Sequence, residues 1–441
     1  MRDMEARRQP QAETPMTIAL TQRPLRIAVF AYEFPALSET FVLNQVTGLI
    51  DRGHHVTVFA TAARADPMVH PDVVSYGLDA RIRYRAMPAG RIERVMSAPA
   101  VAARAGPGNA MPFLRSLNVA RYRGDARSLS LFYWSGALQA REEYDVIHCH
   151  FGTVGREVAF LREIGAIGGK LAVSFHGVDM SACLEAGDGL YRHLFENADL
   201  LLPISEHWRR RLLEMGADPA RMRVHRMGID LERFPFRQRP ASRDREFQIL
   251  TIGRLVEKKG IEYALRAVAG LAGSGMPVRY SIVGDGPLRR QLEDLAAELG
   301  IAGQVHFLGW KDQACVAALM KKSDVLLAPS VTDSRGDQEG IPVTLMEAMA
   351  SGVPVVSTRH SGIPELVISG ETGLLLEERD VCGLRSALAF IWQNPRHAEE
   401  LSVAARARVA REFDVRVLNA RLEAHYKGLL AASGTAEGQR S

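Results

Sequence analysis

The stretch EGIPVTLMEAMASGVPVVST, residues 339–358, reads as a mostly apolar helix followed by a short β-branched strand. The run DVLLAPS (324–330) precedes it and has the length and composition of another buried strand. A strand, a helix and a second strand in this order form the repeating unit of a parallel sheet covered by helices. We therefore expect an α/β fold in which such units recur on both sides of this stretch.

Short apolar runs alternate with helical stretches in both halves of the chain. In the first half the expected strands are RIAVFA (26–31), HHVTVFA (54–60), DVIHCH (145–150), KLAVSFHG (170–177) and DLLLPIS (199–205). In the second half they are FQILTIGRL (247–255), RYSIVGDG (279–286), QVHFLGW (304–310), DVLLAPS and PVVSTRH (354–360). Ligands bind outside the carboxyl ends of the strands in open α/β sheets, so the motifs at these ends carry the functional information.

Two domains of similar size are expected, because 441 residues exceed what one hydrophobic core usually serves. The segment IDLERFPFRQRPASRDREF is rich in Pro and charge and is the predicted linker. The predicted organisation is a flexible extension (1–23), an N-terminal Rossmann-like domain (24–228), the linker (229–247), a C-terminal Rossmann-like domain (248–412), a helix crossing back to the first domain (413–432) and a flexible tail (433–441).

Composition excludes several classes of protein. Hydrophobic residues make up 47% and charged residues 24%, which is typical of a globular chain. The four cysteines have no C-x-x-C spacing, so neither a zinc site nor a disulfide framework is indicated. Neither a signal peptide nor an apolar run long enough to span a membrane can be read. We expect a cytoplasmic protein.

Residues 81–127 hold ten arginines and only two acidic residues, Glu93 and Asp125. Such a stretch suits an anionic membrane face, which would make the protein peripheral at the inner membrane, or an anionic acceptor. A solvated arginine-rich surface is an equally good interpretation. We expect no nucleic-acid partner.

Two carboxylates, Glu339 and Glu347, give the strongest signal for a ligand site. Glu347 lies among apolar neighbours, where an unpaired carboxylate is costly, so it needs ligand hydroxyls, a protein arginine or solvent as a partner. Gly340 and Pro342 begin the helix, whose free N–H groups favour a phosphate. Glu339 at the same end would repel that phosphate if it pointed at it, so we expect Glu339 to accept hydrogen bonds from a neutral sugar.

Three further motifs follow predicted strands. Arg254 and Lys259 in GRLVEKKG are suited to bridging a diphosphate, although a solvated turn is the alternative. Gly284 and Gly286 in VGDGPLR form a tight turn, but Arg289 occupies the place of the third glycine of a dinucleotide fingerprint, which disfavours a dehydrogenase. Trp310 in FLGW would pack against a nucleobase or into the core.

Together the motifs GRLVEKKG, VGDGPLR, FLGW, EGIPVTLMEAMASGVPVVST and SGIPELV resemble the donor domain of glycosyltransferase family 4. The resemblance covers residues 24 to about 430 and implies the GT-B fold, in which two Rossmann-like domains face each other across a cleft. FAYEFPALSETFVLNQ (30–45), SFHGVDMS (174–181) and PSVTDSRGDQEGIPVTLMEAM further resemble bacterial exopolysaccharide and colanic-acid transferases. Transfer of a sugar from a UDP- or GDP-sugar, with retention of configuration, is what the resemblance implies.

The resemblance also implies roles for single residues. Arg254 and Lys259 would hold the diphosphate, Glu347 the ribose hydroxyls and Glu339 the donor sugar. Backbone amides from Gly340 through Ile341 to Val343 would assist. His176 would face the reacting centre, so that His176, Glu339, Arg254 and Lys259 form the catalytic set. Asp179, three residues after His176, would orient the imidazole and is an acceptor-site candidate.

The first loop departs from the family pattern. Many members have a Gly-Gly pair where this chain has YEFPALSET (32–40). Contacts of that loop with phosphate or acceptor therefore cannot be carried over. Glu33, Ser38, Glu39 and Thr40 are acceptor-site candidates only.

No Asp-x-Asp triplet occurs, so we expect no metal ion and no cofactor, with arginine, lysine and the helix N-terminus neutralising the diphosphate. The expected acceptor is a glycan or lipid-linked oligosaccharide. Two alternatives stay open: a GT-B epimerase or phosphorylase, and a non-catalytic scaffold that binds sugar nucleotides.

Overall fold

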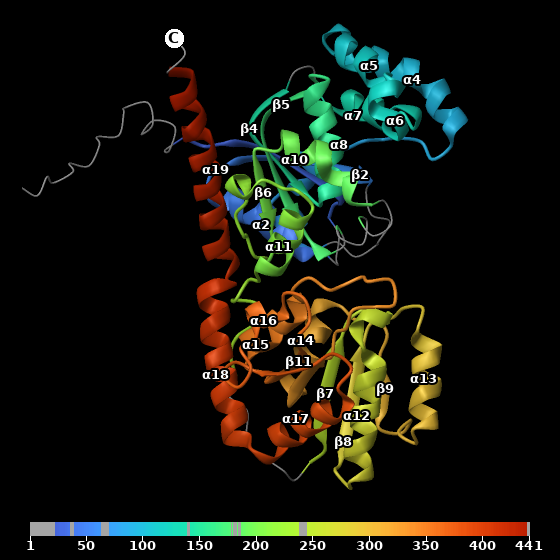
Figure 1. Cartoon of the computed structure of the whole chain (residues 1–441), viewed down its shortest axis with the longest axis vertical. Coiled ribbons are helices and arrows are strands. Elements are labelled where there is room, and N and C mark those ends of the chain that lie inside the picture. The colour runs from blue at the N-terminus through green and yellow to red at the C-terminus, as the bar shows by residue number, and fades with distance from the viewer. Residues whose placement is uncertain are drawn as a thin grey trace, which may run out of the picture.

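The computed structural model describes residues 23–35, 39–62, 70–138, 142–177, 179, 183, 187–237 and 245–438. The candidate Ser38 and the expected N-terminal extension up to residue 22 lie outside the described residues, as do residues 439–441 of the expected tail. Two stacked α/β units follow one another along the longest axis of the molecule (Figure 1).

The first unit contains a six-stranded parallel sheet in the order β3-β2-β1-β4-β5-β6. Its strands are β1 (Arg26–Glu33), β2 (His55–Ala62), β3 (Ile82–Tyr84), β4 (Glu142–His150), β5 (Ile167–Phe175) and β6 (Leu200–Pro203). The chain reverses its direction of travel across the sheet between β1 and β4. Such a switch point leaves a crevice at the carboxyl ends of the strands.

The second unit repeats this plan in the order β12-β11-β10-β7-β8-β9. Its strands are β7 (Phe247–Ile252), β8 (Val278–Val283), β9 (Val305–Phe307), β10 (Val325–Ala328), β11 (Val355–Thr358) and β12 (Leu374–Leu376). The expected α/β fold is confirmed. The edge strands β3 and β12 were not predicted, because three residues are too few to show a period in the sequence.

Helices cover the sheets and connect their strands. In the first unit they are α2 (Thr40–Asp51), α3 (Pro71–Ser75), α4 (Arg91–Ala105), α5 (Ala110–Ser116), α6 (Val119–Arg127), α7 (Ser130–Ala137), α8 (Gly152–Glu163), α10 (Arg192–Asn197) and α11 (Glu206–Glu214). In the second they are α12 (Ile261–Gly273), α13 (Arg289–Glu298), α14 (Gln313–Lys322), α15 (Val343–Ser351), α16 (Ile363–Leu366), α17 (Val381–Gln393) and α18 (Pro395–Glu412), and α19 (Val415–Gly438) follows them.

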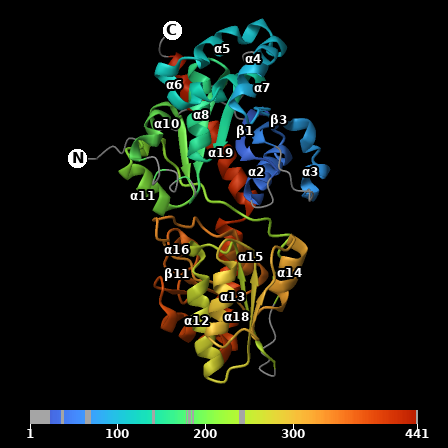
Figure 2. The same cartoon turned by 90° about the vertical axis from the view of Figure 1, so that its right-hand side faces the viewer.

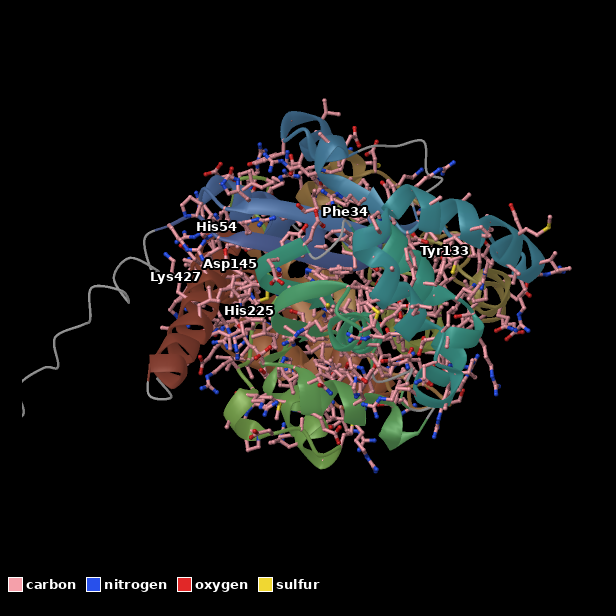
Figure 3. All side chains as sticks on the ribbon, turned by 90° about the horizontal axis from the view of Figure 1, so that it is seen from above. Phe34, His54, Tyr133, Asp145, His225 and Lys427 are labelled. Atoms are coloured by element: carbon pink, nitrogen blue, oxygen red, sulfur yellow. The ribbon has the colours of Figure 1, made fainter. Side chains whose placement is uncertain are left out.

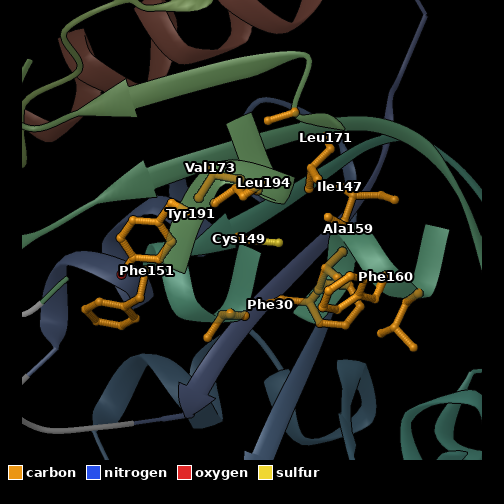
Figure 4. Packing of buried hydrophobic residues seen from close by; sticks show 14 of the residues in the cluster. Phe30, Ile147, Cys149, Phe151, Ala159, Phe160, Leu171, Val173, Tyr191 and Leu194 are labelled. Carbon is orange, nitrogen blue, oxygen red and sulfur yellow. The ribbon is translucent and has the colours of Figure 1, made fainter. Parts of the chain in front are cut away.

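Each sheet has its own apolar core. In the first unit, fully buried Cys149 of β4 and Val173 of β5 pack with Phe151, Tyr191 and Leu194 (Figure 4). The second unit buries the central strands under α12 and α17. Independent cores allow the two units to move relative to each other, as a ligand cleft between domains requires.

The last helix returns to the first unit. Backbone hydrogen bonds join Ile229 to Phe413 and to Val415 at 3.0 Å each, so the chain crosses between the units twice at one point. Beyond it α19 runs along the first unit, as the red helix in Figure 1 shows, and buries Leu422 and Tyr426 in the core of that unit. The helix continues to Gly438, past residue 432 where the sequence predicted a tail.

Helices α4 to α7 (residues 91–137) form an insertion between β3 and β4, which we call the helical insertion. It projects from the far end of the first unit in both views (Figures 1 and 2). In the part of the chain that the structure describes, no helix combines the length and the apolar character needed to cross a membrane.

Close backbone packing of three strand ends makes one glycine irreplaceable. Gly284 has φ +129°, and a Cβ at this position would lie 2.0 Å from the carbonyl oxygen of Gly253. We expect Gly284→Ala to lower the free energy of unfolding by at least about 1–3 kcal/mol, the cost of such a backbone conformation for an L-residue. Gly273→Ala is the control, since it meets nothing within 4 Å at the end of α12. Urea unfolding checks both variants, and equal stabilities would contradict the expectation.

Candidate functional site

The carboxyl ends of the two sheets meet in direct contact. A Cβ on Gly177, which follows β5, would lie 2.9 Å from the backbone nitrogen of Gly340. A Cβ on Gly340 would lie 2.9 Å from Cδ1 of Ile204, at the end of β6. Gly177 is therefore needed for the two loops to approach so closely, because it meets backbone, whereas the end of the Ile204 side chain could shift away from a Cβ at Gly340. The contact brings His176 of one unit and Glu339 of the other to the same crevice.

Glu339 is paired with the lysine that the sequence also selected. Its carboxylate is 8% exposed and accepts a hydrogen bond of 2.8 Å from Nζ of Lys259, with Nζ of Lys258 at 3.9 Å. Burial alone would raise the pKa of Glu339, but Lys259 and Lys258 outweigh it and hold the pKa below its ordinary value. The ionised carboxylate can accept hydrogen bonds from sugar hydroxyls, and it holds Lys259 at the turn after β7.

His360 fixes the backbone of Glu339, a contact that the sequence did not reveal. The backbone N–H of Glu339 donates to Nε2 of fully buried His360 at 2.9 Å. Nδ1 of His360 lies 2.6 Å from a carboxylate oxygen of Glu378. The imidazole therefore carries its hydrogen on Nδ1 and donates it to the carboxylate of Glu378, and Nε2 is the acceptor. Neither residue stood in a motif that pointed to Glu339.

Glu347 has no partner of its own. It lies on α15, is half-buried, and makes no hydrogen bond or ion pair with any residue that the structure describes. The alternative in which a protein arginine neutralises it is therefore wrong for the described residues. Burial raises the pKa of its carboxyl to about 7. A ligand that offers hydroxyl groups would satisfy it.

Arg254 lies exposed at the end of β7, and its guanidinium forms no ion pair with the residues described. Lys259, by contrast, is held by Glu339. The two cations predicted to bridge a diphosphate thus differ: one is fixed and one is free to turn toward a ligand. The helix α15 begins in the same region. Its N-cap residue Pro342 makes no side-chain hydrogen bond, so the first N–H groups of α15 stay available to a ligand.

The remaining donor-site candidates divide into packing and surface positions. Gly286 and Gly284 allow close approach to the backbones of Leu255 and Gly253. Trp310 is 64% exposed, so the alternative that places it in the core is wrong, and its ring is accessible to a flat ligand. Ile341 is buried and Val343 is the first residue of α15, and both therefore position backbone rather than side chain.

His176 lies deeper than expected. It is 6% exposed, packs between Phe41 and Phe151, and its Nε2 faces Nδ1 of His150 at 3.3 Å. Among the residues that the structure describes, its Nδ1 has no hydrogen-bond partner. Burial lowers the pKa of His176 to about 3, so the imidazole is neutral at physiological pH.

The sequence interpretation proposed that Asp179 orients the imidazole of His176. The carboxylate of Asp179 instead accepts hydrogen bonds from backbone N–H groups. One carboxylate oxygen accepts from Gly152 N at the start of α8, and the other from His176 N, both at 2.5 Å. The side chain is 1% exposed, and burial raises its pKa to about 7 against the effect of these bonds. Asp179 is thus a helix cap that fixes the turn carrying His176, a role that the acceptor assignment did not anticipate.

The first loop keeps some of its acceptor candidates at the surface. Glu33 is exposed at the end of β1, whereas Glu39 and Thr40 are half-buried at the start of α2. Within the described part of the chain, neither Glu33 nor Thr40 forms a hydrogen bond or ion pair with Glu339 or His176.

Glu365 joins the two units from within the SGIPELV motif. Its carboxylate accepts from the backbone N–H groups of Glu206 and His207, at 3.0 Å each, at the start of α11. Arg226 pairs with it at 3.3 Å. Nearby, His207 bonds to the side chain of Gln338 at 2.9 Å. Beside these contacts a cavity of about 460 Å³ lies between α11 and the segment 332–338.

Comparison with known proteins bears on both units. The profile described as Glycosyltransferase Family 4 matches residues 38–233, and that described as Glycosyl transferases group 1 matches residues 232–408. The chain is 38% identical over 403 residues to the putative colanic acid biosynthesis glycosyltransferase WcaL of Salmonella typhimurium, covering 90% of this chain and 98% of that protein. It is 36% identical over 393 residues to the amylovoran biosynthesis glycosyltransferase AmsK of Erwinia amylovora, covering 88% and 96%.

Solved structures share the fold. Sucrose-phosphate synthase from Thermosynechococcus elongatus matches with a TM-score of 0.69 and 21% identity, over 92% of this chain and 99% of that one. HepE of Anabaena in complex with UDP and glucose matches with a TM-score of 0.65 and 17% identity, over 92% and 100%. The expected GT-B fold is thereby confirmed.

The unpaired carboxylate of Glu347 predicts a measurable dependence of stability on pH. Its folded-state pKa lies above the ordinary value of 4.5, so the ionised form destabilises the fold, increasingly as pH rises from 4.5 through 7. We expect Glu347→Gln to raise the free energy of unfolding by up to about 3 kcal/mol at pH 8 and by less than about 1 kcal/mol at pH 5. Urea unfolding at both pH values measures this. A variant less stable than the wild type at pH 8 would contradict the absence of a protein partner.

Proposed function

The chain belongs to glycosyltransferase family 4, and from that premise we propose that it transfers a sugar from a nucleoside diphosphate sugar to a growing exopolysaccharide or other cell-surface glycan. The observation that carries the proposal is Glu339, buried beside Lys259 where the strand ends of the two units meet. WcaL and AmsK, which align with the chain almost from end to end, are named for colanic acid and amylovoran biosynthesis. A glycan of that class is the proposed product.

The donor would lie along the carboxyl ends of β7 to β10. Glu347 would accept hydrogen bonds from the ribose, which would satisfy its otherwise unpaired carboxylate. Arg254 would turn onto the diphosphate, joined by Lys259 and the N-terminus of α15. The exposed ring of Trp310 would contact the base. UDP with glucose in the similarly folded HepE supports a nucleotide sugar as the class of donor.

The chemistry would be transfer with loss of a nucleoside diphosphate. Negative charge grows on the leaving phosphate as the glycosidic bond breaks, and the cations at the turn after β7 would stabilise it without a metal ion. Glu339 and Glu347 act in this proposal as binding groups. The acceptor would attack the oxocarbenium-like sugar from the face that the phosphate leaves, so that configuration is retained.

The acceptor would enter from the first unit. Its exposed loop residue Glu33 and the cavity of about 460 Å³ between α11 and the segment 332–338 flank the crevice. A glycan reaching from one unit to the other would be held by both. Closure of the units would then exclude water and align the two substrates.

A membrane surface is the proposed second partner. The ten arginines of residues 81–127 fall into two groups, according to whether the guanidinium is bonded to other protein groups. Five of them are engaged with protein carboxylates or carbonyls, namely Arg83, Arg85, Arg94, Arg115 and Arg121. The guanidinium groups of the other five make no bond to the described residues; these are Arg81, Arg91, Arg104, Arg123 and Arg127. About half of the stretch is therefore available to anionic lipid headgroups.

Apolar side chains on the helical insertion support the same partner. On α4, Ile92 and Met96 are each 78% exposed and Val95 is 65% exposed. On α5, Leu114 is 66% exposed. The opposite side of α4 packs into the insertion through Ala98, Val101, Ala102 and Ala105. A helix that is apolar on both sides, with unpaired arginines, is suited to lying in the interface of an anionic bilayer. A lipid-linked acceptor would be presented there.

Donor binding tests the proposed function. Thermal-shift and calorimetric titration with UDP-, GDP- and ADP-sugars, with and without EDTA, should reveal one class that stabilises the protein in either buffer. Arg254→Ala should weaken that ligand by about 10- to 100-fold, the worth of a hydrogen bond to a charged group. Arg266→Ala, an exposed arginine on α12, is the control. Sugar-independent or absent binding would overturn the proposal, and loss of binding in EDTA would refute metal independence.

Vesicle binding tests the membrane partner. We expect the protein to co-sediment with phosphatidylcholine vesicles containing phosphatidylglycerol, and less with phosphatidylcholine alone. The double change Ile92→Ser and Met96→Ser should weaken binding at least about tenfold through lost apolar burial. Val403→Ser, equally placed on a helix surface but in the second unit, should have no effect. Wild-type protein that stays in the supernatant, or equal loss in the control, would rule this surface out.

A further inference from the structure

A line of buried polar side chains runs beneath His176 to the C-terminal helix. It comprises Tyr426 of α19, His148 and His150 of β4, and Ser174 of β5. All four are at most 3% exposed. Buried polar groups need hydrogen-bond partners, so the direction of every bond along this line is constrained.

The first part of the line has one consistent direction. The hydroxyl of Tyr426 lies 2.6 Å from Nδ1 of His148, and Nε2 of His148 lies 3.0 Å from Oγ of Ser174. Within the described part of the chain, His148 is the one acceptor that the phenol hydrogen has. Tyr426 must therefore donate to Nδ1, because a buried donor without an acceptor is costly. His148 then carries its hydrogen on Nε2 and donates it to Ser174.

The second part of the line continues from a small cavity. A space of about 20 Å³ is lined by Ser174, His150, His176 and His225, among others. It is large enough for one water, and Nε2 of His150 has no hydrogen-bond partner in the described part of the chain. His225 in turn contacts His425 of α19, beside the helix in Figure 3. Because the hydroxyl of Ser174 accepts from His148, its hydrogen is free to donate to that water, which can donate to Nε2 of His150.

The direction then reaches the crevice. When that water donates to Nε2, His150 carries its hydrogen on Nδ1 and donates it across 3.3 Å to Nε2 of His176. His176 is left with a hydrogen on Nδ1, which has no hydrogen-bond partner among the described residues. Burial lowers the pKa of His148, His150 and His176, which keeps all three rings neutral, so that each ring carries one hydrogen.

We propose that Tyr426 is a positioning residue for glycosyl transfer: through His148, Ser174, one water and His150 it fixes His176 as the tautomer with hydrogen on Nδ1, a donor toward an oxygen of the bound sugar nucleotide. The inference rests on the proposed function of His176. It gives α19 a second role, since the helix that crosses between the units also sets the chemistry of the crevice.

The tautomer can be read directly. Long-range ¹H–¹⁵N correlation spectra of the full-length protein, labelled at histidine and without ligand, distinguish hydrogen on Nδ1 from hydrogen on Nε2. We expect Nδ1–H for His176 and Nε2–H for His148 in the wild type. Assignment uses His176→Gln and His148→Gln. Nε2–H at His176 in the wild type would overturn the proposal. This measurement on the wild type does not require any variant to be active.

Two variants should interrupt the line at different points. Tyr426→Phe keeps the buried ring and removes the hydroxyl, and Ser174→Ala breaks the link to the water. Both should convert the His176 signal to a mixture of tautomers. Tyr133→Phe is the control, because that buried hydroxyl donates to Arg94 O at 2.8 Å, away from the line. An unchanged His176 signal in Tyr426→Phe, or the same change in Tyr133→Phe, would refute the assignment. Failure of donor binding would instead refute the proposed function and leave these spectra unaffected.

Discussion

Pairing of one buried carboxylate organises the crevice. Glu339 lies in a position that excludes water, where an ionised carboxylate is stable only beside cations. Lys259 and Lys258 supply that charge, and in doing so they bring the turn after β7 against the segment before α15. His360 fixes the backbone of Glu339 from β11, with Glu378 behind it. Four strand ends of the second sheet are thus drawn to one point, and the loops of the first unit pack on that point through Gly177.

The sequence predicted the parts of this site that follow a short-range pattern. Glu339, Lys259 and the start of α15 are recognisable because they stand directly after strands with clear apolar periods. His360 and Glu378 were missed because their contact with Glu339 joins residues far apart in the chain, and no spacing in the sequence encodes it. Asp179 was assigned by proximity to His176, whereas its carboxylate caps α8, a helix that begins 27 residues earlier. Pairing partners and caps depend on the fold, and motifs do not report them.

Several of the contacts between the units are polar hydrogen bonds, which bears on how the cleft can move. Glu365 caps α11 from the other unit, and His207 bonds to Gln338. Hydrogen bonds of this kind exchange readily with water when two surfaces part, unlike an apolar interface. By contrast, α19 buries Leu422 and Tyr426 in the first unit and continues directly from the crossing point at Ile229. Relative motion of the units is therefore expected to pivot at that crossing while the polar contacts open.

The helix α19 also bears on the chemistry of the crevice. His176 is held as one tautomer only if the hydrogen bonds along the line from Tyr426 have one donor-to-acceptor direction. That direction is fixed when the first group of the line is a donor with a single available acceptor. A tyrosine hydroxyl that bonds to one imidazole meets this condition, and Tyr426 is held in place by the packing of α19 on the first unit. Because that packing belongs to the first unit alone, opening of the cleft leaves the line from Tyr426 to His176 intact. The polar contacts between the units, which open, therefore lie on other elements than the hydrogen bonds from Tyr426 to His176, which must persist.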